Sequence, residues 1–329
     1  VLKPILESTV HDSANFEGSV EVDPRRTTRE HLEVLYRLGF RRVSLGVQDF
    51  DPEVQRMVNR IQPVAITENI TKMAREIGYD SVNFDLIYGL PKQDAVRFVK
   101  TAEITLALRP DRIALYSFAL VPWIKKVQRI FKDEDLPEGT EKRAIYEVAR
   151  EMLLAGGYVE IGMDHFALPT DALARAMRDG SLHRNFMGYT DQRTDILLGI
   201  GLSAISETPT CFHQNEKVLP VYERLLDSGK IPTLRGHRLS ELDRCRREQI
   251  LELMTTGETR FESAEQARDA GKFLEEPIRD GLAHVIEEKG ELLLRVTEAG
   301  KPFLRNICMA FDQRLREKAP TTRTFSQAV

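Results

Sequence analysis

The chain has 329 residues, of which 42% are hydrophobic and 30% are charged, a composition typical of a globular protein with a substantial core. Its length predicts about two domains, although one βα barrel could take up most of it. With 47 basic and 51 acidic residues the formal net charge is −4, which argues against a protein that coats nucleic acid or a membrane surface. No apolar run approaches the roughly 18 residues of a membrane span, and no secretory signal is visible, so we expect a cytoplasmic protein.

The three cysteines, Cys211, Cys245 and Cys308, are widely spaced along the chain. Their number is odd and none belongs to a C-x-x-C pair, so the pattern supports neither a disulfide framework nor a zinc ribbon. We therefore expect unpaired, reduced thiols and no metal site built by this chain alone.

The first half of the chain alternates between strand and helix patterns. Runs rich in β-branched or aromatic residues predict strands over residues 19–22, 42–47, 81–87 and 112–118. The first helix between them opens with a capping box of Thr27 and Glu30 and runs to Leu38. Further helices are expected over residues 51–60, 67–77 and 94–108. Strands joined by such helices pair in parallel, so this half predicts an α/β parallel sheet or part of a βα barrel.

The second half changes in character along its length. A helix is expected over residues 138–155, then a strand over 158–163 and a loop-rich stretch over 164–210. Beyond it, charged helices are predicted over 240–254 and 263–280, a hairpin over 283–296 and a last helix over 301–318. The expected domains are a barrel remainder at 1–135, a connecting helix, strand and active-site loops at 136–235, and a mostly helical domain with a β-hairpin at 236–329.

Polar residues stand where the predicted strands of the first half end. In βα barrels and doubly wound sheets, ligands bind at the carboxyl ends of the parallel strands. Glu21, Gln48 and Asp85 occupy such positions, and we expect them to point toward one rim. An aspartate among apolar neighbours is costly to bury unless it bonds a ligand or a nearby donor. The alternative is that these groups only cap turns or satisfy backbone amides.

Other motifs are weaker. Gly199-Ile200-Gly201-Leu202-Ser203-Ala204 fits the dinucleotide fingerprint superficially, but it lacks the strand–helix context; a backbone loop that approaches a ligand is the alternative. Asp164-His165 and His183-Arg184-Asn185 suggest a metal site or an acid–base pair, although histidines with structural hydrogen bonds are the favoured interpretation. The helix and hairpin over 263–296 resemble a winged helix next to a group of arginines, but the negative net charge leads us to expect no nucleic-acid partner.

Several longer strings occur in a fixed order along the chain. They are Glu21-Val22-Asp23-Pro24, Ser44-Leu45-Gly46-Val47-Gln48-Asp49-Phe50, Val58-Asn59-Arg60, Asp85-Leu86-Ile87-Tyr88-Gly89-Leu90-Pro91, Ile161-Gly162-Met163-Asp164-His165-Phe166-Ala167, Leu182-His183-Arg184-Asn185-Phe186, Gly199-Ile200-Gly201-Leu202-Ser203-Ala204-Ile205-Ser206 and Arg305-Asn306-Ile307-Cys308-Met309. Together they resemble the oxygen-independent coproporphyrinogen III oxidases (coproporphyrinogen dehydrogenases), a family of radical S-adenosylmethionine (SAM) enzymes. The resemblance runs from about Ser19 to the carboxyl end.

This resemblance implies an incomplete radical-SAM βα barrel, with the later strands only, followed by a mostly helical C-terminal domain. It implies an oxidoreductase that converts two propionates of coproporphyrinogen III to vinyl groups with loss of CO2, giving protoporphyrinogen IX in anaerobic haem biosynthesis. The implied cofactors are a [4Fe–4S] cluster and two SAM molecules. The cluster passes an electron to SAM, and the resulting deoxyadenosyl radical removes a propionate hydrogen. We also expect a reduced flavodoxin-type or other electron donor and a monomeric full protein.

Carried over position by position, the family's SAM-contacting residues fall on Glu21, Gln48, Arg60, Asp85, Ala119 and Ile205. Our hypothesis for the individual roles is that Glu21 and Asp85 accept from ribose hydroxyls or the methionine amine, and that Arg60 pairs with a carboxylate. Ala119 and Ile205 would offer backbone groups or apolar contact to the adenine. No catalytic side chain and no metal ligand is assigned.

The chain departs from the family pattern at the cluster. The family's C-x-x-x-C-x-x-C loop and its glycine-rich turn do not occur in this sequence, and the three cysteines are too dispersed to replace the loop. We therefore expect catalysis by the complete protein and none by this chain alone, as for a fragment. The alternatives are a related haem-binding radical SAM chaperone and a truncated, non-catalytic binding module.

Overall fold

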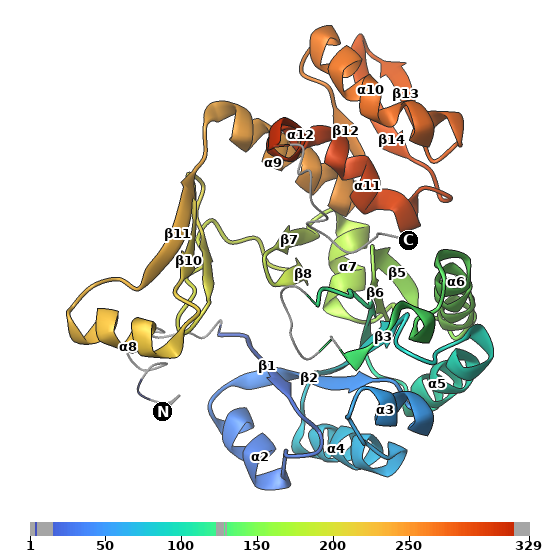
Figure 1. The fold of residues 1–329 in the computed structure, drawn as a ribbon, viewed down its shortest axis with the longest axis vertical. Coiled ribbons are helices and arrows are strands. Elements are labelled where there is room, and N and C mark those ends of the chain that lie inside the picture. The colour runs from blue at the N-terminus through green and yellow to red at the C-terminus, as the bar shows by residue number, and fades with distance from the viewer. Residues whose placement is uncertain (1–3, 5–15, 123–127, 129, 319–329) are drawn as a thin grey trace. The chain divides into compact units, whose positions relative to one another are not determined.

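The computed structural model describes Pro4, residues 16–122, Gln128 and residues 130–318 (Figure 1). The chain forms two compact units, one up to Ala174 and the other from Arg175. The finer division at residues 135 and 235 stays a prediction. None of the described helices is long and apolar enough to cross a membrane.

A six-stranded sheet organises the first unit, in the order β1-β2-β3-β4-β6-β5. Strands β1 to β4 pair in parallel, whereas β6 is antiparallel to β4, and β5 is antiparallel to β6. The four parallel strands confirm the sequence prediction and form a partial barrel sheet in which β1 is an edge. The strand bounds are Gly18–Val22 (β1), Phe40–Gln48 (β2), Ser81–Tyr88 (β3), Arg112–Ser117 (β4), Val159–Gly162 (β5) and His165–Ala167 (β6).

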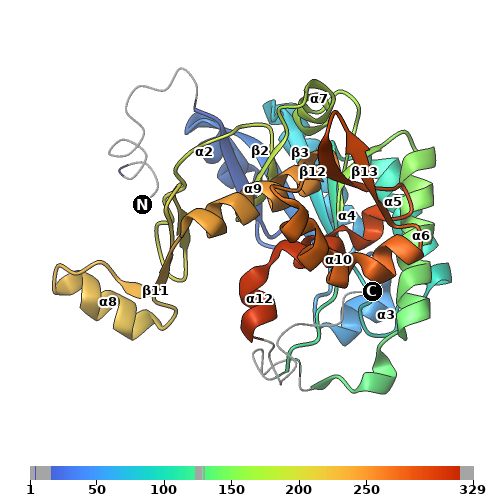
Figure 2. The same cartoon turned by 90° about the horizontal axis from the view of Figure 1, so that it is seen from above.

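Helices cover one face of this sheet. In both views α4, α5 and α6 lie side by side along it (Figures 1 and 2). Along β3 the residues Val82, Phe84 and Leu86 are buried beneath the helices, whereas Asn83 and Asp85 are only partly buried. Because successive strand side chains point to opposite faces, the second pair lies on the face away from the helices. The helix bounds are Arg29–Arg37 (α2), Pro52–Met57 (α3), Val64–Ile77 (α4), Ala95–Leu108 (α5) and Gly139–Ala155 (α6).

Two expected helix ends in the first unit are wrong. The expected capping box of Thr27 and Glu30 does not form: the Thr27 hydroxyl donates to the Asp23 carbonyl instead. Helix α2 is capped by Thr28 and His31, and the Thr28 hydroxyl accepts from the His31 N–H over 3.3 Å. Helix α3 ends at Met57 and does not reach Arg60. The cause is Asn59, whose φ of 51° is left-handed and breaks the helix.

The described part of the second unit contains three small antiparallel sheets: the pair β7-β8, the three strands β11-β10-β9 and the three strands β12-β14-β13. Strand β10 lies between β9 and β11, and α8 lies at the far end of β10 and β11 (Figures 1 and 2). The bounds are His183–Asn185 (β7), Gly188–Thr190 (β8), Ile205–Glu207 (β9), Cys211–Asn215 (β10), Leu219–Asp227 (α8) and Thr233–Arg238 (β11). The remainder consists of Glu241–Thr256 (α9), Glu258–Arg260 (β12), Ala264–Arg279 (α10), Ala283–Glu288 (β13), Glu291–Val296 (β14), Leu304–Cys308 (α11) and Gln313–Lys318 (α12).

The expected hairpin near residue 290 is confirmed as β13 and β14, but the expected continuous last helix is wrong. The stretch 164–210 is rich in loops, as expected, but it also holds the short strands β6 to β9 and a helix, Ala172–Asp179 (α7). Strands of three residues are too short to show alternation, so the sequence pattern misses them. The last helix is broken into α11, α12 and short 3₁₀ turns, because Asp312 leaves the helical conformation and its carboxylate caps Leu315.

Candidate functional site

The face of the first unit's sheet that points away from α4, α5 and α6 carries a group of polar side chains. In the parallel register Glu21 lies opposite Ser44, and Ser44 lies opposite Asn83. Further toward the carboxyl ends, Gly46 lies opposite Asp85. Because alternate residues of a strand share a face, these positions lie side by side on the face away from the helices.

Asp85 is held by donors on its own strand and on the neighbouring one. The Ser44 hydroxyl donates to its Oδ2 over 2.8 Å, and the Asn83 amide donates to its Oδ1 over 2.9 Å. Burial raises the pKa of the Asp85 carboxyl, as does the nearby Glu21, whereas the two hydrogen bonds and His165 lower it. Each carboxylate oxygen keeps a further lone pair. Asp85 is therefore a fixed acceptor for a hydroxyl or ammonium group of a ligand.

The carboxyl end of β2 is distorted around Gly46. The register with β3 shifts between Gly46 and Gln48, and Gln48 has a positive φ of 69°. A Cβ at Gly46 would lie 3.0 Å from Nε2 of Gln48 and 3.2 Å from Nη2 of Arg60. The Gln48 and Arg60 side chains therefore converge over the backbone of Gly46, where a larger residue would press on both.

Arg60 follows α3 and reaches back to the same strand end. Its Nη2 donates to the Gly46 carbonyl over 2.6 Å and lies 3.5 Å from Oδ1 of Asp23. Its Nε is buried and has no hydrogen-bond partner among the described residues. Burial lowers the pKa of the Arg60 guanidinium, and leaving a buried donor unpaired costs about 1 to 3 kcal/mol. This N–H is suited to an acceptor that a ligand would bring, such as a carboxylate.

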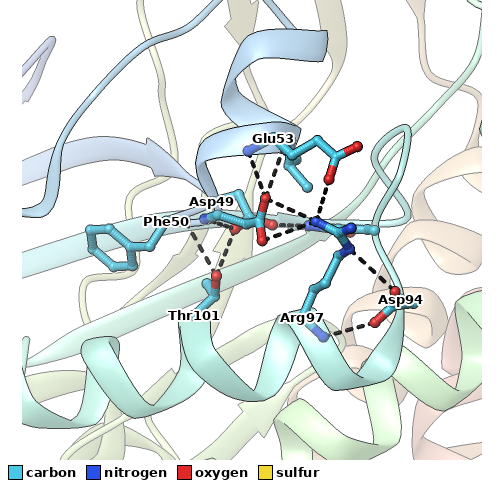
Figure 3. A network of polar contacts seen from close by, with 9 residues as sticks. Asp49, Phe50, Glu53, Asp94, Arg97 and Thr101 are labelled. Atoms are coloured by element: carbon cyan, nitrogen blue, oxygen red, sulfur yellow. Dashed lines mark hydrogen bonds and ion pairs between the residues drawn. The ribbon is translucent and has the colours of Figure 1, made fainter.

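A buried network fastens the residue after Gln48 to helix α5 (Figure 3). Asp49 is 1% exposed, and its Oδ1 accepts from the Thr101 hydroxyl over 2.6 Å and from the Asp51 N–H over 2.7 Å. Gln93 donates to its other oxygen. Burial raises the pKa of the Asp49 carboxyl, and these donors act in the opposite direction. The network fixes the backbone that carries the Gln48 side chain.

Arg97 extends this network at the start of α5. Its guanidinium lies 2.7 Å from the Glu53 carboxylate and 3.3 Å from that of Asp51, and it also meets Asp94 (Figure 3). The sequence shows Asp49 only as a strand-end residue. Its partner Thr101 is 52 positions away, and no local pattern links the two.

The end of β4, near Ala119, is held by two side chains that no sequence signal marks. Gln128 Nε2 donates to the Ala119 carbonyl over 3.1 Å, and Lys142 Nζ donates to the Phe118 carbonyl over 3.0 Å. The Lys142 ammonium also lies 5.8 Å from the centre of the Tyr88 ring, and burial lowers its pKa. These bonds fix the backbone that follows β4.

Four of the six expected SAM-contacting residues meet at the carboxyl ends of β1 to β3: Glu21, Gln48, Arg60 and Asp85. Ala119 lies two residues beyond β4. Ile205 lies in β9 of the second unit, opposite Gln214. Contact of any of the six with SAM stays a prediction.

The glycine motif over 199–204 precedes an antiparallel strand and does not follow a parallel one. A Cβ at Gly199 would lie 2.5 Å from the Ile205 carbonyl oxygen. The Asn215 amide donates to the carbonyls of Gly199 over 3.3 Å and Gly201 over 2.8 Å. Gly199 thus allows close packing within its own unit, and Gly201 adopts a positive φ of 101°, roles that argue against a dinucleotide site.

The other polar motifs do not assemble a metal site. Nδ1 of His165 lies 3.1 Å from Asp164 Oδ1, and its ring meets Tyr116 edge-on at 5.9 Å between centroids. His183 lies in β7 of the second unit. Within residues 16–122 and 130–318 no group of three His, Cys, Asp or Glu side chains is arranged to hold a metal ion. The contact between His165 and Asp164 agrees with the interpretation favoured from the sequence, a histidine with a structural hydrogen bond.

The cysteines do not fit an iron–sulfur cluster. Cys211, Cys245 and Cys308 are free thiols on β10, α9 and α11. Burial raises the pKa of both Cys245 and Cys308 to about 12, and only thiolates bind metal well. The described residues therefore supply no ligand set for a [4Fe–4S] cluster.

Comparison with known proteins defines the family. The model of the radical SAM superfamily matches residues 3–104. An oxygen-independent coproporphyrinogen III oxidase from Escherichia coli (strain K12) is 42% identical over 327 residues, which cover 97% of this chain and 71% of that protein. The chain belongs to the oxygen-independent coproporphyrinogen III oxidase family. It is a homologue of a radical SAM oxidoreductase.

Two further comparisons agree with this family assignment. The enzyme of the same description from Paracoccus denitrificans (strain Pd 1222) is 42% identical over 302 residues, so the chain spans 66% of its length. The solved structure of coproporphyrinogen III oxidase from Escherichia coli, described as a radical SAM enzyme, superposes with a TM-score of 0.89 at 40% identity. It covers 95% of this chain and 74% of that one. This agreement supports an α/β fold with a partial barrel sheet.

Proposed function

We propose that the complete protein of this chain oxidises coproporphyrinogen III without oxygen, converting two propionates to vinyl groups with loss of CO2, in anaerobic haem biosynthesis. Family membership supports the reaction. The observation that carries the cofactor assignment is the polar edge at β1 to β3, where the buried Nε of Arg60 lacks an acceptor among the described residues. The strand-end position is where βα barrels bind their ligands.

The residues at this edge fit SAM in their chemistry. Arg60 would pair its unpartnered N–H with the methionine carboxylate. Asp85 and Glu21 would accept from ribose hydroxyls or the methionine ammonium, with Asp85 already oriented by Ser44 and Asn83. Gln48 would add an amide, and Ala119 a backbone group, at the adjoining strand ends.

The chain's own contribution is to bind, orient and exclude water. SAM, together with a [4Fe–4S] cluster, supplies the hydrogen-atom abstraction that such a reaction requires. The described residues do not fit the cluster, so its ligands are not among them. Fixed dipoles at the strand ends would hold a polar ligand without reorganisation, and a site closed to water would protect a reactive radical.

The other expectations drawn from the family resemblance are also part of this proposal. They are a second SAM molecule with Ile205 at one of the sites, a reduced flavodoxin-type or other electron donor, a monomeric complete protein and a cytoplasmic location. Haem binding without porphyrinogen turnover would favour the haem-carrying relative.

Calorimetric titration of the complete protein with SAM tests the cofactor assignment. We expect Arg60→Gln to weaken SAM binding about tenfold or more, since it removes one charge-assisted contact. Arg279→Gln, at an exposed position of α10 in the second unit, is the matched control and should bind SAM normally. Equal affinities for the Arg60→Gln variant and the wild type would remove Arg60 from the site.

A further inference from the structure

The second unit contains a pocket that the proposed chemistry at the sheet edge does not use. Its volume is about 630 Å³, within the range of roughly 300 to 1,000 Å³ typical of small-molecule sites. All of its lining residues lie between Arg184 and Arg314, so the pocket belongs to this unit alone. Its apolar wall includes Phe212 of β10, three side chains of α9 (Leu242, Ile250 and Met254) and Phe311.

Two ion pairs within the pocket are already complete. Arg247 binds the Glu207 carboxylate and also donates to the Thr208 carbonyl over 3.1 Å. Arg314 makes two hydrogen bonds to Asp243, of 2.7 and 2.8 Å, and these lower the pKa of the Asp243 carboxyl. Both carboxylates are therefore neutralised and do not compete for other cations.

Two further arginines in the lining lack such partners. Nη1 of Arg184 is buried without a hydrogen-bond partner among the described residues, and its guanidinium stacks 4.8 Å from the centre of the Tyr189 ring. Nε of Arg246 is likewise buried and unpartnered, although its Nη1 donates to Gln249 over 3.1 Å. Neither arginine forms an ion pair with a described residue. An unpaired buried guanidinium donor is costly, and an anion bound beside Arg184 or Arg246 would lower that cost.

We propose that this pocket binds a propionate-bearing tetrapyrrole, with one propionate at Arg184 and a pyrrole ring against the apolar wall. A carboxylate is the expected ligand group because the planar guanidinium of Arg184 can donate two parallel hydrogen bonds to its oxygens. The rest of the ligand is expected to be apolar because it would contact Phe212, Leu242 and Ile250. The choice of a tetrapyrrole rests on the proposed function.

The test titrates the 329-residue chain with coproporphyrin III, the stable oxidised form of the tetrapyrrole, and follows the porphyrin fluorescence. The wild type should bind, and Arg184→Gln should weaken binding about tenfold or more. Arg184→Lys keeps the charge and should recover part of the affinity. Leu242→Glu, at a partly exposed wall position, should also weaken binding because it places a carboxylate beside the propionate. Arg279→Gln is the control, and each variant is checked by its thermal unfolding midpoint.

Two results would overturn the inference. One is an Arg184→Gln variant that folds normally and binds coproporphyrin III as the wild type does. The other is equal binding of the tetramethyl ester of coproporphyrin, which has the same ring but no free carboxylate. Either result leaves the proposed function standing if the complete protein still turns over coproporphyrinogen III. If the complete protein does not turn over coproporphyrinogen III but the chain binds coproporphyrin III in a way that depends on Arg184, the proposed function is wrong and the pocket assignment still holds.

Discussion

The Ser44 hydroxyl donates a hydrogen bond of 2.8 Å to the carboxylate of Asp85 on the next parallel strand. The same hydroxyl accepts from the Asn83 amide over 2.8 Å, and that amide also donates to Asp85. The three side chains form a closed set on the face away from the helices. Asp85 thus keeps one orientation before any ligand arrives, as a preorganised acceptor should.

Asp85 gives a prediction about stability and pH. Because burial raises its pKa above the ordinary 3.8, the folded state holds this proton more tightly than the unfolded chain. Its contribution to the free energy of unfolding therefore falls as the pH rises from that value through the folded pKa. As the pH rises from about 4 to neutral, the free energy of unfolding of Asp85→Asn should therefore increase relative to that of wild type. Urea unfolding at pH 4 and at neutral pH measures this, and a free energy of unfolding of Asp85→Asn minus that of wild type that stays constant or falls toward neutral pH would contradict it.

The same variant separates stability from binding. The substitution removes the negative charge that accepts from the ligand, so Asp85→Asn in the complete protein should bind SAM about tenfold more weakly. Ser44→Ala removes only the orienting hydroxyl and should have a smaller effect on SAM affinity. Wild-type affinity in the Asp85→Asn variant would place Asp85 outside the site.

Gly46 gives a steric prediction. In Gly46→Ala the new Cβ would lie 3.0 Å from the Gln48 amide and 3.2 Å from the Arg60 guanidinium, so both side chains must move. We expect weaker SAM binding with little change in the unfolding midpoint. Gly139→Ala is the matched control, because a Cβ there has no atom within 4 Å. Equal SAM affinities for the two variants would show that the convergence over Gly46 has no role in binding.

The Asp49 network gives a prediction about stability alone. Thr101→Val removes a hydroxyl that donates to a buried carboxylate, and this should lower the free energy of unfolding by about 1 to 3 kcal/mol. Thr105→Val, one turn later on α5, removes only a bond to a helix carbonyl and should cost less. Urea unfolding curves compare the two variants. A larger loss in Thr105→Val would mean that Thr101 does not anchor Asp49.

The cysteines give a prediction about metal content. Reconstitution of the 329-residue chain with iron and sulfide should yield no stoichiometric [4Fe–4S] cluster, because its thiols lie on three separate elements and two are held protonated by burial. Iron analysis and the cluster's visible absorbance measure the outcome. A chain that binds four irons and keeps them through gel filtration would contradict this.

The longer regular elements of the first unit could be predicted from sequence because each has a local signal, whereas the three-residue strand β6 is missed. Strand β3 and helix α4 show the periods of two and 3.6 residues that burial on one face imposes, and Gly78 ends α4 at the expected place. Short elements escape this reasoning, as β7 and β8 show. Thr28 and Thr27 are equally good capping residues, and only the fold decides between them.

The candidate site could be predicted in its residues but not in its geometry. Glu21 and Asp85 stand out because ligands bind at the carboxyl ends of parallel strands, and because Asp85 is costly to bury among its apolar neighbours. The left-handed backbone of Gln48 and the unpaired N–H of Arg60 depend on a register shift and on a turn at Asn59, for which the sequence has no pattern. Lys142 and Gln128 are missed for the same reason, since their partners are backbone carbonyls.

Anaerobic turnover of coproporphyrinogen III by the complete protein tests the central claim most directly. With SAM and a reducing agent, the wild type should release two CO2 per protoporphyrinogen IX formed, and Arg60→Gln should lose most of this activity while Arg279→Gln keeps it. The account would be contradicted by a cluster-loaded wild type that leaves coproporphyrinogen III unchanged, or by full activity in the Arg60→Gln variant.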